Sequence, residues 1–389
     1  MKLVINRDLL IKAVNLVVKA ADKRHRLAIL ANIKIELSPE FLVLTGSDIE
    51  LELTVRLPIS PDVCIEAGST TLPAEMFFGI CKSLSDEMVT IEAPQGSLRC
   101  QISSGQGKYT LSALPADDFP GVGAGVPTTI VKIAQSDLVD LIHRTRFAMA
   151  TQDVRHYLTG VLFELGGEQL TAVATDGHRL AMAYRPLNET YEPTQMIIPG
   201  KAISELERLL LELSKSSNDE QVVELGFNGE YLQVALTLTN EEQVGVAAGM
   251  EVGLTARLIE GKFPDYRRVI PTENDKKVYF DRDAMADVLR RISILNSKEV
   301  PGVLLNFSST DTLKIGVDDK RSKSQAEELL AVSYQGGPIE LSFNESYLRA
   351  VLGVLEGKVC IEMSQPGSPT LIYQDGDEFY RHVIMPMRV

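Results

Sequence analysis

Hydrophobic and polar residues alternate most clearly between positions 49 and 57, where Ile, Leu, Leu, Val and Leu occupy every second place. Successive side chains of a β-strand point to opposite faces of its sheet, so this segment is predicted to be a strand with one buried face. The same pattern occurs over residues 161–165, before Gly166-Gly167, and over residues 303–307, before the polar segment 308–311. Such breaks after a strand predict a hairpin turn at both places.

A helical period precedes the first of these strands. Leu10, Ala13, Val14 and Val17 recur three or four residues apart, which predicts a helix that buries one face. Two sets of basic residues recur at helical spacing on other faces: Lys12, Lys19 and Lys23 in the first helix, and Lys201, Arg208 and Lys215 in the middle of the chain. A mildly basic helix face and an ordinary solvated surface both fit these residues.

Several sequence markers recur three times in the same order, which predicts three copies of one structural unit. The first marker is an aspartate that opens a helical stretch (Asp8, Asp137, Asp283), and the second is an aspartate that follows a strand (Asp48, Asp176, Asp318). The third is the start of a second helix (near Pro73, Pro199, Phe343), and the last is an apolar residue followed by proline at the end of the unit (Phe119-Pro120, Phe263-Pro264, Met385-Pro386). The spacing predicts repeats at residues 1–126, 127–272 and 273–389, with an insertion between 199 and 263 in the middle copy.

Composition limits the functions that this chain can have. Its 39 Lys and Arg face 53 Asp and Glu, which gives a net charge of −14 and argues against charge-driven wrapping of nucleic acid. Its 4 cysteines form no Cys-x-x-Cys pair, so neither a zinc ribbon nor a redox motif is expected. We find no secretory signal and no run of 18 apolar residues, and we therefore expect a cytoplasmic protein without metal or cofactor.

Candidate catalytic chemistry is sparse. Gly121, Gly123 and Gly125 have the wrong spacing and context for a dinucleotide fingerprint and are interpreted as a linker. Asp176 and His178 could form an aspartate-oriented general base, but Asp176-Gly177 between two strands is also a common hairpin turn. No nucleophile motif accompanies them, so the turn is the favoured interpretation.

Two segments are unusual: residues 261–269 and the apolar terminus 382–389. Chain ends are normally polar and frayed. Methionine beside proline offers adaptable surface for apolar partners, so Met385-Pro386-Met387 is a candidate docking surface. A final strand packed into its own domain explains the terminus equally well.

The chain resembles the bacterial replicative sliding clamps, the beta subunits of DNA polymerase III, over essentially its whole length. The resemblance rests on six segments: Leu27-x-Ile29-Leu30, Leu111-Ser112-x-Leu114-Pro115-Ala116-x-Asp118-Phe119-Pro120, Gln152-Asp153-Val154-Arg155, the run from Val173 to Leu180, the run from Phe263 to Val269, and Met385-Pro386-Met387-Arg388. It implies an α+β fold of three clamp-type domains, each with two helices against antiparallel sheets, in a homodimeric ring with the helices inside.

The resemblance also implies a function. Such clamps are not enzymes; they encircle duplex DNA without sequence preference and bind polymerase subunits, the clamp loader and repair proteins through short peptides, with no role for a membrane. Retention by encirclement would reconcile DNA binding with a negative net charge, because the hole then needs only weak phosphate contacts.

Site residues follow from the same resemblance. The peptide groove would be formed by Leu158, Thr175, Gly177, His178, Arg179, Leu180, Pro264, Arg268, Val269, Asn344, Tyr347, Val383, Ile384, Met385, Pro386, Met387 and Arg388. The DNA-facing residues would be Arg24, Gln152, Arg155, Tyr157 and Lys201, and the dimer interface would join Tyr109 and Leu111 to Ile294 and Leu295 of the second copy. Glu75 and Met76 stand where such clamps usually carry a basic pair, which weakens the DNA-facing assignment of the first repeat.

The sequence is also compatible with two alternative functions. A dimeric, β-rich adaptor could bind peptides in the same groove without encircling DNA. A hydrolase could use Asp176 and His178.

Overall fold

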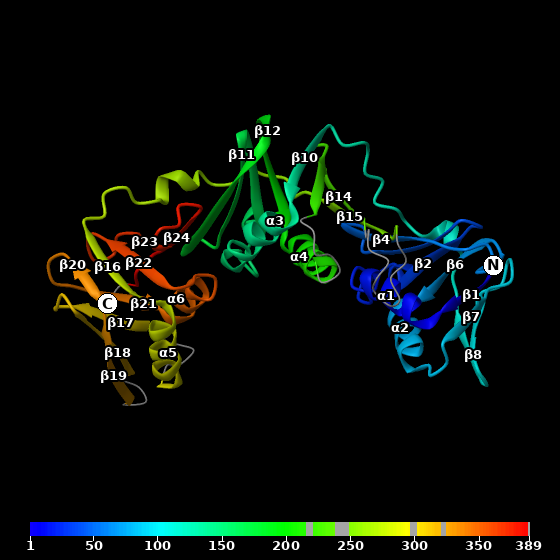
Figure 1. Ribbon diagram of the computed structural model, residues 1–389, viewed down its shortest axis with the longest axis horizontal. Helices are drawn as coiled ribbons and strands as arrows, with labels where there is room; N and C mark the ends of the chain where they lie inside the picture. The colour runs from blue at the N-terminus through cyan, green and yellow to red at the C-terminus, as the bar shows by residue number, and fades with distance from the viewer. Residues whose placement is uncertain (215–220, 238–248, 296–301, 320–323, 388–389) are drawn as a thin grey trace. The chain divides into compact units, whose positions relative to one another are not determined.

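A computed structural model describes residues 1–214, 221–237, 249–295, 302–319 and 324–387. By its contacts the chain divides into two compact units, whose helices and strands are labelled in Figure 1. The first unit contains Met1–Val139 and Lys201–Ile259, and the second contains Asp140–Gly200 and Glu260–Val389. Every strand pair among the described residues is antiparallel.

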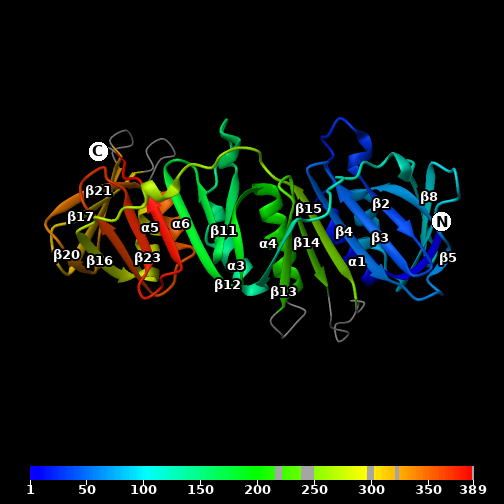
Figure 2. The same ribbon diagram turned by 90° about the horizontal axis from the view of Figure 1, so that it is seen from above.

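The first unit has two sheets, visible in Figure 2. In spatial order, the five-stranded sheet consists of β5 (Cys64–Glu66), β1 (Lys2–Asn6), β7 (Met88–Glu92), β8 (Arg99–Ser104) and β9 (Gly107–Ser112). The eight-stranded sheet consists of β10 (Thr129–Ala134), β13 (Val222–Phe227), β14 (Tyr231–Thr237), β15 (Glu251–Arg257), β4 (Leu51–Pro58), β3 (Phe41–Ser47), β2 (Asn32–Leu37) and β6 (Gly68–Pro73). Its helices are α1 (Arg7–Val17), α2 (Ala74–Ser83) and α4 (Gly200–Ser214).

The second unit also has two sheets. Its seven-stranded sheet runs β11 (Gly160–Thr175), β12 (Arg179–Pro199), β24 (Tyr380–Ile384), β23 (Thr370–Gln374), β22 (Lys358–Met363), β16 (Lys276–Asp281) and β20 (Ser333–Gln335). The four-stranded sheet runs β19 (Ser324–Ala331), β18 (Thr312–Asp319), β17 (Gly302–Phe307) and β21 (Ile339–Asn344). The helices are α3 (Gln135–His143), which crosses the boundary of the two units, α5 (Arg282–Ile292) and α6 (Glu345–Leu352).

Apolar side chains of α5 and α6 form one core with the strands around them. Val288, Leu289, Val351 and Leu352 are among the buried residues that pack with β16, β17, β18, β21 and β22. Removing such side chains from water contributes roughly 1.5 to 3 kcal/mol each before the entropy of ordering is subtracted. This core holds the surfaces of the second unit in place.

The predicted alternating strand is β4, and its Leu51, Leu53, Val55 and Leu57 are all buried. Ile49 lies before the strand in a turn, where its backbone has φ +79°. The hairpin at 308–311 is confirmed as well, because β17 ends at Phe307 and β18 begins at Thr312.

Two local predictions are wrong. The predicted apolar face of the first helix is buried, but α1 ends at Val17, so Lys19 and Lys23 lie beyond it. The N–H of Ala20 donates to the carbonyl of Val17 and tightens the chain into a turn there. Gly166-Gly167 is not a hairpin turn either: β11 continues through it with register shifts on both sides of Gly167, whose φ is +62°. The long partner strand β12 keeps the pairing in place, so the glycines form a bulge.

Two strand pairs join segments from different predicted repeats, and we call these pairs seams. In the first unit β4 pairs with β15, placing Leu53 opposite Leu254. In the second unit β12 pairs with β24, placing Leu180 opposite Val383.

The placing of the repeat boundaries at residues 126 and 272 stays a prediction. Across the described ranges, no helix is long and apolar enough to cross a membrane.

Candidate functional site

The hairpin between β11 and β12 is fixed by its own polar side chains. Oδ1 of Asp176 accepts from the N–H groups of His178 and Arg179 at 2.9 and 3.0 Å. Thr175 donates its hydroxyl to the carbonyl of Arg179 at 2.7 Å and accepts from the N–H of Gly177 at 3.1 Å. Gly177 has φ +90°, which favours glycine. The turn interpretation is confirmed, and Oδ2 of Asp176 accepts from Nε of Arg179 at 3.0 Å rather than orienting an imidazole.

Aromatic and cationic side chains gather beside this hairpin. The rings of His178 and Tyr347, on α6, stack with their centroids 6.4 Å apart. The guanidinium carbon of Arg179 lies 4.6 Å from the ring centre of Tyr347 and 5.5 Å from that of Phe147. Cation–π contacts of this kind hold a side chain in one orientation. Burial raises the pKa of Tyr347, and the charge of Asp176 adds to the rise, so the phenol stays protonated.

The terminal strand lies directly against the hairpin. The N–H of Met385 donates to the carbonyl of His178 at 2.9 Å, and the N–H of Met387 donates to the carbonyl of Ser342 at 2.7 Å. Val383 and Ile384 are buried, whereas Met385 is 38% exposed. The tail is therefore a strand packed into the sheet up to Ile384 and a surface segment after it. Arg388 lies outside the described residues.

The other predicted groove residues fall into two groups. Leu158 is buried in the short helix His156–Leu158 before β11, and Thr175 and Leu180 are buried at the hairpin itself. Asn344 is half-buried at the N-cap of α6, where its side chain accepts from the N–H of Ser346. Pro264, Arg268 and Val269 are exposed, and Pro386 is half-buried.

The segment that carries Pro264, Arg268 and Val269 is anchored to β11. The hydroxyl of Tyr266 donates to Glu164 at 2.5 Å, and the guanidinium of Arg267 lies 2.7 Å from the same carboxylate. Burial alone would raise the pKa of Glu164, but the hydrogen bonds from Tyr266, Gln195 and Arg267 outweigh it and lower that pKa. The carboxylate therefore stays ionised and keeps the segment in place.

A polar junction that the sequence did not predict lies where α3, β12 and β24 meet. Asp140 accepts from Nε of Arg144 at 2.8 Å, from Arg185 and from the hydroxyl of Tyr380. Arg144 also donates to the carbonyl of Val354 at 2.8 Å. The carboxylate thus links strands and a helix from two predicted repeats. No spacing in the sequence marks these residues, because they meet only in the folded chain.

His382 is the second unpredicted feature of β24. Its side chain is fully buried, its ring centroid lies 5.7 Å from that of Phe147, and neither ring nitrogen has a hydrogen-bond partner among the described residues. Burial lowers the pKa of His382 to about 3, and the charges of Arg144 and Arg381 add to the effect. The imidazole is therefore neutral, and it lies in the same strand as Val383 and Ile384.

The predicted DNA-facing residues lie in both units. In the second unit, Gln152 and Arg155 are exposed and Tyr157 is half-buried in one loop. The guanidinium of Arg155 binds both carboxylate oxygens of Asp153 at 3.0 and 2.7 Å, which raises the pKa of Arg155 and lowers that of Asp153 to about 2. Arg155 also lies beside the hairpin, because a Cβ added to Gly177 would be 3.4 Å from its Nη2.

In the first unit, Arg24 is exposed and Lys201 forms an ion pair with Asp48. Arg208, predicted on the same stripe as Lys201, donates to Glu205 and Glu212 at 2.7 and 2.9 Å. Lys215 lies outside the described residues. Lys201 and Arg208 on α4 are thus balanced by neighbouring carboxylates.

The predicted interface residues lie at or near sheet edges. Tyr109 is 40% exposed on the edge strand β9, where Leu111 is buried. Ile294 is 79% exposed and Leu295 is half-buried in the short helix Ser293–Leu295 that follows α5.

Three domain models of one family match the chain in order. They describe the N-terminal domain of the DNA polymerase III beta subunit at residues 1–123, the central domain at 132–265 and the C-terminal domain at 267–388. Curated relatives named beta sliding clamp are 38% identical over 395 residues in Pseudomonas aeruginosa and 34% identical over 391 residues in Escherichia coli K12, each with 100% of both chains covered.

Solved structures agree with this match. A crystal structure of the DNA polymerase III subunit beta from Pseudomonas aeruginosa has a TM-score of 0.88 at 36% identity, and a sliding clamp from the same organism bound to griselimycin has 0.89 at 36%, with 100% of both chains covered in each case. The chain is therefore a sliding-clamp protein of the three-domain clamp fold. It belongs to the beta subunit family of DNA polymerase III, whose relatives are named for a clamp and not for a catalyst.

Proposed function

We propose that two copies of this chain form a closed ring that encircles duplex DNA and tethers other replication and repair proteins through the groove at the β11–β12 hairpin. The pattern of seams is the observation that supports a closed ring. In each seam the third strand after one repeat's second helix pairs with a strand of the preceding repeat: β15 follows α4 and pairs with β4, and β24 follows α6 and pairs with β12.

The same pattern supports a third kind of seam. β9 is the third strand after α2 and lies at the edge of its sheet, and β19 is the corresponding edge strand of the last repeat. Pairing β9 of one copy with β19 of the other, near Tyr109 and Ile294, gives two equal head-to-tail interfaces. Two such interfaces close a ring with two-fold symmetry.

Encirclement also fits the charges. Arg155 and Lys201 already have carboxylate partners, so their contacts with phosphate would be weak and exchangeable. A ring needs no tighter contacts, because DNA cannot leave it sideways, and weak contacts allow sliding.

The groove is supported by its geometry and by a relative's ligand. Buried Leu180 and Val383 pair beside a hairpin edged by His178, Arg179 and Met385, a mixture of apolar floor and polar rim that suits an inserted peptide. Pseudomonas aeruginosa and Bartonella birtlesii clamps have been solved with griselimycin bound. We infer that this chain binds the same ligand class, and that polymerase subunits and the clamp loader use the same groove.

Retention on circular DNA tests the ring. Protein loaded on a nicked circle should remain bound through gel filtration and should dissociate once the circle is cut to a linear form. Equal loss from both forms would contradict encirclement and favour the peptide-binding adaptor. Changing Ile294 to Ala should abolish retention without reducing griselimycin affinity, which separates the interface from the groove.

A further inference from the structure

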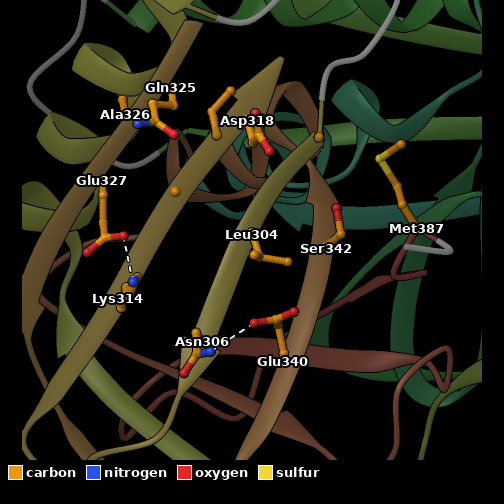
Figure 3. A pocket seen from close by; sticks show the side chains of 13 residues that line it. Leu304, Asn306, Lys314, Asp318, Gln325, Ala326, Glu327, Glu340, Ser342 and Met387 are labelled. Atoms are coloured by element: carbon orange, nitrogen blue, oxygen red, sulfur yellow. Dashed lines mark hydrogen bonds and ion pairs between the residues drawn. The ribbon is translucent and has the colours of Figure 1, made fainter. Parts of the chain in front are cut away.

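The outward face of the four-stranded sheet in the second unit is hollowed into a trough of about 720 Å³ (Figure 3). One row of paired residues crosses the whole sheet: Glu327 on β19, Gly316 on β18, Leu304 on β17, Ser342 on β21 and Met387 beyond it. Paired residues of antiparallel strands point to the same face. Gly316 and Ser342, the small residues on either side of Leu304, leave its half-buried side chain as an apolar floor.

The walls of the trough are predominantly acidic. Asp318, Glu327 and Glu340 line it, and Lys314 is the one cation among its described lining residues. Lys314 lies 2.5 Å from Glu327, and Asn306 donates to Glu340 at 2.8 Å, so both contacts hold polar side chains at the rim (Figure 3). An apolar floor between carboxylates complements a segment that alternates apolar and cationic residues, and it disfavours nucleic acid.

One end of the trough is continuous with the peptide groove. Met387 lines the trough, and Met385, two residues earlier, is hydrogen-bonded to the groove hairpin at His178. A chain that leaves the groove along this tail therefore reaches the trough at Ser342. Four strand spacings of about 4.8 Å give a path of roughly 19 Å, which about six extended residues would span.

We propose that the trough binds an extended, cationic segment flanking the clamp-binding peptide of the same partner chain. Apolar side chains of this segment contact Leu304, and its lysines or arginines face Glu327 and Glu340. The inference rests on the proposed groove, which it extends into a second contact on the outer sheet. Partners with such a basic flank bind more tightly than partners that offer the groove peptide alone.

Isothermal titration with two capped pentapeptides tests the proposal: lysine–leucine–lysine–leucine–lysine and its counterpart with glutamate in place of lysine. The cationic peptide should bind the full-length protein and the acidic one should not. Leu304→Lys should weaken binding at least tenfold. Thr312→Lys adds the same charge on the same face of β18, outside the trough lining, and should change binding less than twofold.

Further measurements separate the possible failures. Glu340→Gln is a milder change at the rim and should weaken binding of the cationic peptide about threefold. It tests the proposal even if the Leu304→Lys variant does not fold. Saturation with griselimycin should not displace the pentapeptide, and neither lysine variant should alter griselimycin affinity. Failure of griselimycin to bind the unaltered protein would refute the groove instead.

Three results would overturn the trough assignment. They are equal weakening by both lysine variants, displacement of the pentapeptide by griselimycin, and a change in sedimentation of the peptide-free protein caused by Leu304→Lys. The last result would identify the trough as a contact between copies of the chain.

Discussion

The hairpin of the proposed groove and the loop that is proposed to face DNA lie side by side in the second unit, yet they are built in opposite ways. Four hydrogen bonds between the backbone and the side chains of Thr175 and Asp176 hold the hairpin, which includes the buried Leu180 and pairs with β24 at Val383. In the loop, Gln152 and Arg155 are exposed, and Arg155 is held by the single carboxylate of Asp153. A preformed apolar surface suits retention of one partner, whereas exposed cations with exchangeable anions suit transient contact with many phosphates.

The largest effect on stability should come from the polar junction at Asp140. Asp140→Ala removes the carboxylate that Arg144, Arg185 and Tyr380 share, and it should lower the free energy of unfolding by about 3 kcal/mol, because the two largely desolvated guanidinium groups lose that counter-charge. Urea unfolding measures this. Asp265→Ala, which breaks the exposed pair with Arg268, should cost less than about 0.5 kcal/mol. Comparable losses in both variants would show that the junction does not stabilise the groove side.

A smaller effect is expected from acid. The imidazole of His382 has a pKa of about 3 in the folded chain, whereas it protonates near pH 6.5 when unfolded. Between these values the unfolded state binds more protons, so stability is full above pH 6.5 and falls as the pH drops toward 3. The loss should reach about 2 kcal/mol at pH 5.

His382→Phe should remove this part of the pH dependence, while the surface change His156→Phe should leave it intact. Unfolding by urea at pH 7 and pH 5 distinguishes the two. An unaltered slope in His382→Phe would mean that other groups cause the acid sensitivity.

The smallest effects should separate the two surfaces. Lys201→Gln should reduce the slope of log affinity for DNA against log salt by about 0.9 and leave griselimycin affinity unchanged. Met385→Ala should weaken griselimycin about fivefold through lost apolar contact and leave the salt slope unchanged. If either variant alters both measurements, the groove and the DNA contacts are coupled rather than independent.

Local pattern was enough to predict part of this fold. The alternation in β4, the buried face of α1 and the hairpin at Asp176-Gly177 each depend on residues within a few positions of one another. The bulge at Gly166-Gly167 does not, because a glycine pair turns or continues according to the length of the partner strand, here β12.

The residues of the candidate site also fall into two groups: those that sequence motifs mark and those that only the fold brings together. Family motifs marked His178, Arg179 and the methionine tail. In the structure His178 and Arg179 meet at the ring of Tyr347, and the tail is hydrogen-bonded to His178 through Met385. Phe147 and the junction at Asp140 carry no local signal. They come from segments far apart in the chain, and only the fold places them against β24.

The seam between β12 and β24 has a practical consequence for anyone who dissects this molecule. A fragment that contains only the last 117 residues or so would lack the neighbour that satisfies the backbone amides and carbonyls on one side of β24. Such a fragment would expose an unpaired edge strand, which makes it a poor reagent for ligand screening. Both sides of β24 are paired only when β12, from the preceding repeat, is kept with β23 and β24, as in the second unit.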